Sequence, residues 1–232
     1  MTTHSHRILI GASGWIHPDW EQSFYPEDLP ADWQLGFYSN EFPVVLMPAA
    51  YWQAHAEEID GWLDDSHDEL MIIAELPEAC LQGSTDTMLG AIDEFVNGLS
   101  VLSDHVGGLL VPVAKCNDDV LACLSQLSCT FPVCVDPAKT IEAEALISIQ
   151  KVCQAKAYGL CWRGSGDPDG LAYGSLALSR IDAGGQDMRE IREKVETILN
   201  TTKLEQTSVL IIEGMPPDIS AMRNAGVILD LI

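Results

Sequence analysis

Short apolar runs separated by longer amphipathic stretches are the feature that most constrains the fold of this chain. The runs are rich in β-branched residues and are hydrophobic continuously rather than at alternate positions. Strands that are buried on both faces of a parallel sheet have this pattern. It predicts strands at residues 7–11, 44–47, 70–75, 107–113, 131–135, 158–162 and 208–213, with a final candidate at 227–232.

Helical patterns fill most of the intervals between these runs. Apolar side chains recur every three to four positions over residues 87–103, and residues 118–127, 141–155 and 187–199 follow the same rule. Eight strands alternating with helices favour an α/β fold of the TIM type, a closed (β/α)₈ barrel, over an open sheet. The length of 232 residues is close to the norm of about 250 for such barrels, so we expect a complete or slightly truncated one.

Residues 164–185 interrupt this alternation and make an irregular barrel a second expectation. The segment is rich in Gly, Asp and Ser, and residues 175–181 within it read either as an extra strand or as an irregular connection. No repeat or interdomain linker is evident. We therefore expect one domain over residues 1–232, with residues 1–6 as a flexible tail.

The charge balance bears on possible partners. The chain has 35 acidic and 12 basic residues, a formal net charge of −23. Binding to phosphate backbones requires clusters of Lys and Arg, which the sequence lacks, so nucleic acid and anionic membranes are poor partners. The apolar runs are also too short to span a bilayer. An odd number of cysteines without CxxC spacing, and no signal segment at the start, predict a reduced, cytoplasmic protein.

The segment 8–26, ILIGASGWIHPDWEQSFYP, is unusual because it leaves a predicted strand through glycines and then presents several aromatic rings. Glycines there allow a tight turn and a close backbone approach. The rings either line a ligand site or cover the end of the barrel. The residues predicted to contact a ligand are Ser13, Trp15, His17, Trp20 and Tyr25.

This segment resembles the opening of the domain of unknown function 72 family, the YecE-like proteins. Members begin with a strand, a G-T-S-G-W-x-Y-x-x-W motif and then F-Y-P. Here Ala12 stands at the Thr and His17 at the Tyr, while the Gly, Ser, Trp, Phe, Tyr and Pro positions match. The resemblance implies a TIM-type barrel related in shape to xylose-isomerase-like enzymes. It implies no particular activity, because the function of the family is itself unsettled.

The chain departs from the family pattern at the predicted strand ends. Leu46 and Pro48 stand where the family has Glu and Asn, and Glu75 stands where it has Lys. The V-E-F-R-H of strand five reads Val-Cys-Val-Asp-Pro at 133–137, and the R-x-H-G of strand six reads Cys-Trp-Arg-Gly at 161–164. The chemistry of a barrel lies at the C-terminal ends of its strands, so this chain resembles a divergent member that has lost most of the family's polar site.

Four ionisable residues remain at or just beyond predicted strand ends: Glu75, Asp136, Arg163 and Glu213. One hypothesis makes the three carboxylates a site for Mg²⁺ or Mn²⁺, with Arg163 as an anion clamp and His17 as a general base. Arg163 and His17 are then the catalytic candidates. The alternative is that the carboxylates are paired with backbone groups or with Arg163, or are exposed.

Two classes of function follow from these alternatives. In the first, the protein is not an enzyme and binds a small molecule or another protein after losing the family's polar site. In the second, it is a metal-assisted hydrolase or isomerase that acts on a small sugar-like or phosphorylated substrate through an acidic barrel mouth. The apolar replacement of several converging polar groups favours the first class. The sequence names neither ligand nor partner.

Overall fold

The computed structural model describes residues 8–54, 61–63, 66–102 and 104–232, and within them eight parallel strands form a nearly closed barrel. The expected flexible tail, residues 1–6, lies outside the described residues. The strands are β1 (Ile8–Ser13), β2 (Val44–Met47), β3 (Met71–Glu75), β4 (Val106–Val113), β5 (Val133–Pro137), β6 (Gly159–Leu160), β7 (Leu176–Asp182) and β8 (Thr207–Glu213).

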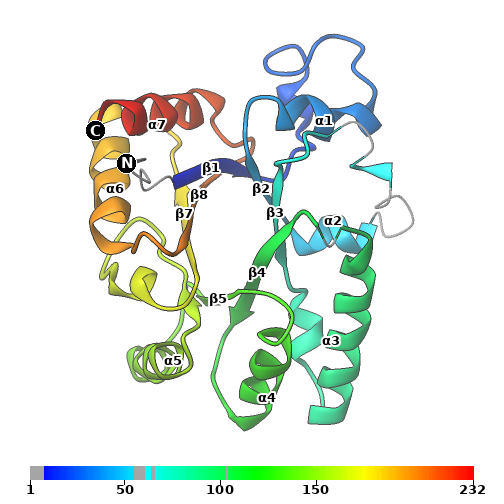
Figure 1. The fold of residues 1–232 in the computed structure, drawn as a ribbon, viewed down its shortest axis with the longest axis vertical. Coiled ribbons are helices and arrows are strands. Elements are labelled where there is room, and N and C mark those ends of the chain that lie inside the picture. Colours follow the sequence, from blue (N-terminus) through cyan, green and yellow to red (C-terminus); the bar gives the residue numbers. More distant parts are fainter. Residues whose placement is uncertain (1–7, 55–60, 64–65, 103) are drawn as a thin grey trace.

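Helices surround this barrel on the outside (Figure 1). The described helices are α1 (Gln34–Ser39), α2 (Ala49–Ala54), α3 (Thr85–Leu99), α4 (Asp118–Leu127), α5 (Ala143–Lys156), α6 (Met188–Thr201) and α7 (Ile219–Leu231). The prediction of a TIM-type (β/α)₈ barrel is confirmed. No helix in the described part of the chain is long and apolar enough to cross a membrane.

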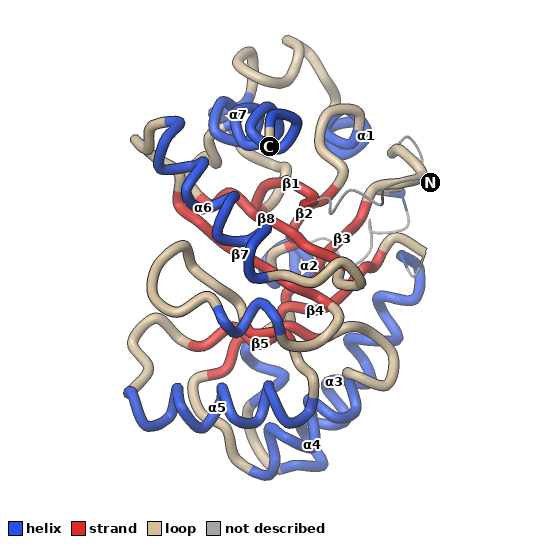
Figure 2. The backbone as a smooth tube through the Cα atoms, turned by 60° about the vertical axis from the view of Figure 1, so that its left-hand side comes forward, coloured by secondary structure: helices blue, strands red, loops and turns tan. Residues whose placement is uncertain are grey.

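The sheet runs in the order β6-β5-β4-β3-β2-β1-β8-β7, so closure depends on the contact between β6 and β7. These strands meet through a bridge between Trp162 and Ser179. The Trp162 amide donates to the Leu178 carbonyl at 3.1 Å, and the Arg180 amide donates to the Trp162 carbonyl at 2.8 Å. The tube view shows the strands enclosed by the surrounding helices (Figure 2). The hydrogen bonds that join the two edges therefore lie just beyond the C-terminal end of β6, toward the mouth.

Side chains that point into the barrel form a separate apolar cluster. They come from six strands and from the residue that follows β6, and they pack as Val44, Leu46, Ile73, Leu110, Cys134, Cys161, Leu176, Leu178, Val209 and Ile211. Residues of the opposite parity join the larger core between strands and helices. This period of two explains why the strands read as continuous apolar runs, since both faces are buried.

One predicted strand near the C-terminus was assigned wrongly. Residues 227–232, expected as the last strand, belong to α7, whose buried residues Ala221, Met222, Ala225 and Ile228 recur at helical spacing. The eighth strand is instead β7, which covers most of residues 175–181, so the structure selects the extra strand over the irregular connection for that stretch. A short apolar run has no decisive period, and here the amphipathic spacing upstream of residue 227 determined the structure.

Candidate functional site

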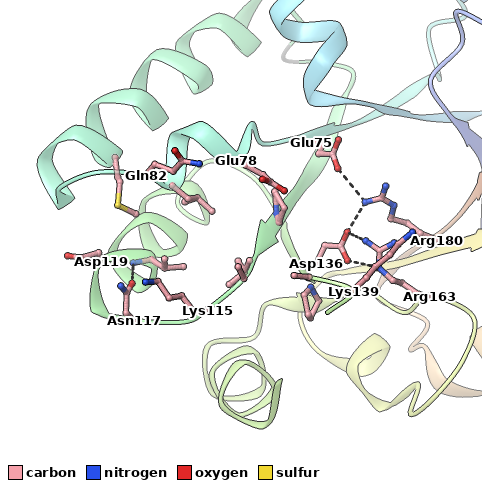
Figure 3. A pocket seen from close by; sticks show the side chains of 18 of the residues that line it. Glu75, Glu78, Gln82, Lys115, Asn117, Asp119, Asp136, Lys139, Arg163 and Arg180 are labelled. Carbon is pink, nitrogen blue, oxygen red and sulfur yellow. Dashed lines mark hydrogen bonds and ion pairs between the residues drawn. The ribbon is translucent and has the colours of Figure 1, made fainter. Parts of the chain in front are cut away.

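Five charged side chains converge at the C-terminal mouth of the barrel (Figure 3). Each charged residue lies two positions after a residue whose side chain points into the barrel interior. Because side chains alternate along a strand with a period of two, the charged side chain points to the same interior face. The pairs are Ile73 with Glu75, Cys134 with Asp136, Cys161 with Arg163, Leu178 with Arg180, and Ile211 with Glu213. The charged group therefore forms the layer directly above the apolar interior.

Arg180 lies at the centre of this group. Its Nη1 is 2.7 Å from Asp136 Oδ2 and 3.4 Å from Glu75 Oε1. Its Nε donates to Glu213 Oε1 at 2.7 Å, and its Nη2 lies 2.5 Å from the same oxygen. One guanidinium thus links carboxylates from β3, β5 and β8, and its side chain is only 12% exposed.

Arg163 makes the second set of contacts, and it shares Asp136 Oδ2 with Arg180. Its Nε and Nη2 donate to Asp136 Oδ1 and Oδ2 at 3.1 Å and 2.6 Å, which is a bidentate pair. Its Nη1 lies 3.6 Å from Glu213 Oε2. The side chain is 28% exposed, so the Arg163 guanidinium is more accessible to solvent than that of Arg180.

The electrostatics of the group follow from this arrangement. Burial is the largest effect on Arg180 and lowers the pKa of its guanidinium, but the carboxylates of Glu213 and Asp136 together with other nearby groups outweigh it and raise the pKa. Asp136 is only 3% exposed, and both of its oxygens accept N–H donors. Two arginines and three carboxylates therefore hold one another in place, and the formal charge of these five side chains together is about −1.

A pocket of about 660 Å³ opens beside this network. The five charged residues form one end of it. The rest of its polar lining comes from Glu78, Gln82, Lys115, Asn117, Asp119 and Lys139, which follow β3, β4 and β5. Drug-sized ligands occupy cavities of about 300–1,000 Å³, so the volume suits a small organic molecule.

The three predicted metal ligands, Glu75, Asp136 and Glu213, do lie together at the mouth, and Arg163 lies beside them. Arg180 was not among the predicted site residues, because residues 175–181 were left open between an extra strand and an irregular connection. Its signal was present: a single arginine in the mostly apolar sequence LALSRID of β7 requires buried counter-charges. Among the described residues, no group of three or more His, Cys, Asp or Glu is arranged to hold a metal ion.

The aromatic residues of the first loop lie elsewhere. Trp15, Trp20 and Tyr25 are buried, and none of them lines the mouth pocket. The Tyr25 hydroxyl donates to the Trp15 carbonyl at 2.6 Å, and the Trp20 indole donates to the Pro217 carbonyl at 3.1 Å. Their rings pack at the edges of neighbouring aromatic rings from the same loop, α1 and α2. In this structure their surfaces contact protein.

Ser13 ends β1, and His17 lies in the loop that follows. His17 Nε2 is 3.1 Å from the Ser13 carbonyl, and the imidazole ring packs on Trp20 with ring centres 4.4 Å apart. Burial lowers the pKa of His17 below its ordinary value of 6.5, although contacts with backbone groups of Ser13 and Gly14 oppose this shift. His17 does not line the mouth pocket, which separates it from Arg163, the other catalytic candidate.

Gly11 in β1 and Gly14 directly after β1 show why the segment 8–26 contains small residues. A Cβ atom on Gly11 would lie 1.8 Å from the Val44 carbonyl oxygen of the adjacent strand, so only glycine allows that approach. Gly14 has a φ of +78°, a conformation that side chains disfavour, and it turns the chain out of β1. The prediction of a tight turn with close backbone contact is confirmed.

Comparison with known proteins gave one family and several structures. The family described as "Protein of unknown function DUF72" matches residues 9–140, more than half of the chain. A DUF72 family protein from Enterococcus faecalis V583 is 15% identical, with a TM-score of 0.66 over 99% of this chain and 100% of that one. Another from Thermotoga maritima MSB8 is 12% identical, with a TM-score of 0.71 over 96% and 99%.

One solved structure with a lower TM-score is described as an enzyme rather than as a DUF72 family protein. Malate synthase from Haloferax volcanii, solved as a ternary complex with pyruvate and acetyl-CoA, is 11% identical, with a TM-score of 0.50 over 98% of this chain and 70% of that one. At such identities the likeness concerns the fold alone. The search of curated proteins found no match.

Proposed function

This chain belongs to the DUF72 family of proteins of unknown function, and from that premise we propose that its mouth pocket binds a small organic molecule without catalysing a reaction. The proposal rests on one observation: the carboxylate oxygens at the mouth already have N–H donors of the protein close to them. Each of the six oxygens of Glu75, Asp136 and Glu213 lies within 3.6 Å of an N–H donor. The donors come from Arg163, Arg180 and the Ala49 amide.

This occupation bears directly on metal chemistry. A divalent cation binds carboxylate oxygens at about 2.0–2.6 Å, inside the distances at which the guanidinium groups now lie. Metal binding would require Arg180 to leave the three carboxylates that it links. The convergence of those carboxylates still favours a metal-assisted hydrolase or isomerase as the second candidate function, and the experiment below distinguishes the two.

The lining of the pocket supports binding rather than catalysis. Among the described residues, no His, Cys, Ser, Thr or Tyr side chain lines it. Hydroxyl, thiol and imidazole groups, which many nucleophiles and general bases use, are therefore missing from the described part of this lining. The carboxylates at the mouth, which could do the same work, are held by arginines and a backbone amide. Burial also raises the pKa of the Cys134 thiol well above its ordinary value, and this residue packs in the barrel interior beneath the mouth. A thiol held protonated is a poor nucleophile.

A thermal-shift screen tests the proposal. The panel contains neutral polyols, organic acids, sugar phosphates, amines, Mg²⁺ and Mn²⁺, each measured with the wild-type protein and with Ala138→Trp, which places an indole in the pocket. Ala155→Trp on the exposed face of α5 is the matched control. A ligand at a hundred times its dissociation constant adds about 2.7 kcal/mol of stability.

We expect at least one organic compound to stabilise the wild type and the control but not Ala138→Trp. Stabilisation by Mg²⁺ or Mn²⁺ that disappears in the Glu75→Ala and Asp136→Ala double variant would overturn the proposal in favour of the metal-assisted enzyme. A panel in which no organic compound stabilises the wild type would overturn it as well.

A further inference from the structure

Cations gather at the mouth pocket to an extent that the composition of the chain does not predict. The whole protein has 12 basic residues against 35 acidic ones. Four of the 12, Lys115, Lys139, Arg163 and Arg180, line this pocket, whereas five of the 35 acidic residues do so. A third of the positive charge therefore faces one cavity, together with a seventh of the negative charge. This enrichment indicates a ligand with an anionic group.

The four cations are not equivalent. Arg180 is committed to three carboxylates, as its contacts show. Arg163 binds Asp136 with Nε and Nη2, but its Nη1 has only the 3.6 Å approach to Glu213. A guanidinium has five N–H donors, so Arg163 keeps donors for a further acceptor. Arg163 is thus the arginine available to a ligand, and Arg180 holds the carboxylates in place.

The two lysines add charge without internal partners. Lys115 and Lys139 are exposed, and in the described part of the chain neither forms an ion pair with a carboxylate. Lys139 lies at the Arg163 end of the pocket, and Lys115 lies toward Gln82 and Asn117 at the other end (Figure 3). An oxyanion at the first end meets Arg163 and Lys139 together.

The other residues that line the pocket indicate which functional groups the ligand has besides its anionic group. Glu78, Gln82, Asn117 and Asp119 supply carboxylate and amide groups along the length of the pocket. Carboxylates accept hydrogen bonds from hydroxyl groups, and amides both donate and accept them. A volume of about 660 Å³ exceeds the need of a single phosphate or carboxylate. The chemistry of the lining therefore suits an anion that bears several hydroxyl groups.

We propose that the mouth pocket binds a polyhydroxylated organic anion whose carboxylate or phosphate group is held by Arg163 and Lys139. This inference rests on the proposed binding function and specifies the class of ligand. The carboxylate and the phosphate share the same recognition, a planar or tetrahedral oxyanion on a guanidinium and an ammonium group.

Calorimetric titration separates these possibilities. The probes are gluconate, glucose 6-phosphate, inorganic phosphate and neutral sorbitol, each titrated into the wild type, Arg163→Gln, Lys139→Gln and Lys151→Gln. Lys151 lies on the exposed face of α5 and is the control. We expect gluconate or glucose 6-phosphate to bind, and the affinity to fall about 10- to 100-fold in Arg163→Gln, since a hydrogen bond to a charged group is lost. Lys139→Gln should weaken binding by a smaller factor and Lys151→Gln should not.

The outcomes distinguish this inference from the function on which it rests. Binding of sorbitol with no binding of either organic anion would overturn the anionic ligand and leave the binding pocket intact. Inorganic phosphate that binds as tightly as glucose 6-phosphate would overturn the hydroxyl contacts. Unchanged affinity in both Arg163→Gln and Lys139→Gln would overturn the assigned site, and the lysine variant decides this if the arginine variant fails to fold. No binding by any probe, together with a silent thermal-shift panel, would overturn both proposals.

Discussion

Arg180 is the single residue on which the mouth of this barrel depends most. Its guanidinium forms ion pairs with three carboxylates, those of Glu75, Asp136 and Glu213. Asp136 is buried, so these pairs take the place of hydrogen bonds to water. Burying charges is costly unless each is paired, and removing one partner leaves the others uncompensated. The network is therefore a structural constraint on the strands β3, β5, β7 and β8.

The substitution Arg180→Met tests that dependence. We expect the free energy of unfolding to fall by about 3–5 kcal/mol, because three carboxylates lose their common partner. Urea denaturation monitored by circular dichroism measures the loss. Arg189→Met is the matched control, since Arg189 pairs with Glu193 on the exposed surface of α6 and such pairs contribute less than about 1 kcal/mol.

A second substitution identifies the source of that loss. In the Arg180→Met background, Asp136→Asn should cost less than it does in the wild type, since the buried charge that it removes has already lost one of its two arginine partners. A loss in Arg180→Met no larger than that in Arg189→Met would contradict the role given to the network.

Among the elements, α7 shows best how packing selects between helix and strand. Its N-cap, Asp218, accepts hydrogen bonds from the Ser220 and Ala221 amides at 2.8 Å and 3.2 Å. These bonds satisfy amides that a helix start leaves free. The neighbouring residues Val227 and Ile228 differ in solvent exposure: Val227 is 51% exposed and Ile228 is 4% exposed.

This difference gives a paired prediction. Ile228→Ala should lower the free energy of unfolding by about 2–4 kcal/mol, since it leaves a cavity against β1 and α6. Val227→Ala, one position earlier, should change it by less than about 0.5 kcal/mol. Thermal or urea denaturation of the two variants decides the matter. Equal losses, or a larger loss for Val227→Ala, would contradict the helical packing of this segment.

The same element shows how far the sequence predicts the fold. Seven strands were recognised because runs such as Val44–Met47 and Thr207–Glu213 are apolar on both faces and flanked by turn residues. The strand β7 was obscured by the glycine-rich segment before it, and residues 227–232 were assigned to a strand because six apolar-rich positions fit either period. Tertiary packing, which no single sequence displays, resolved both.

The candidate site was predictable to a similar degree. Glu75, Asp136, Arg163 and Glu213 were identified from their places at predicted strand ends, and the structure brings all four together. Pairing with backbone groups or with Arg163 was one of the two alternatives, and the structure shows both kinds of contact. The sequence did not reveal the central part of Arg180, because residues 175–181 were left open between an extra strand and an irregular connection. A charge and its counter-charge can be 105 residues apart, as in Glu75 and Arg180, and only barrel closure makes them neighbours.

At the scale of the whole molecule, the net charge of −23 surrounds a mouth that is nearly neutral. A strongly acidic surface attracts cations without specific sites, while the pairing of the mouth carboxylates with arginines opposes a specific one. These carboxylates are already paired within the protein, and we propose that the pocket is therefore open to an organic ligand rather than to a metal.

Titration calorimetry of Mn²⁺ into metal-free protein tests this claim most directly. The salt concentration should be about 0.15 M, at which loose surface binding is screened. The Glu75→Gln and Glu213→Gln double variant serves as the reference for the site. We predict no saturable Mn²⁺ site tighter than about 0.1 mM that the double variant lacks. A single tighter site, present in the wild type and abolished in the double variant, would contradict the account.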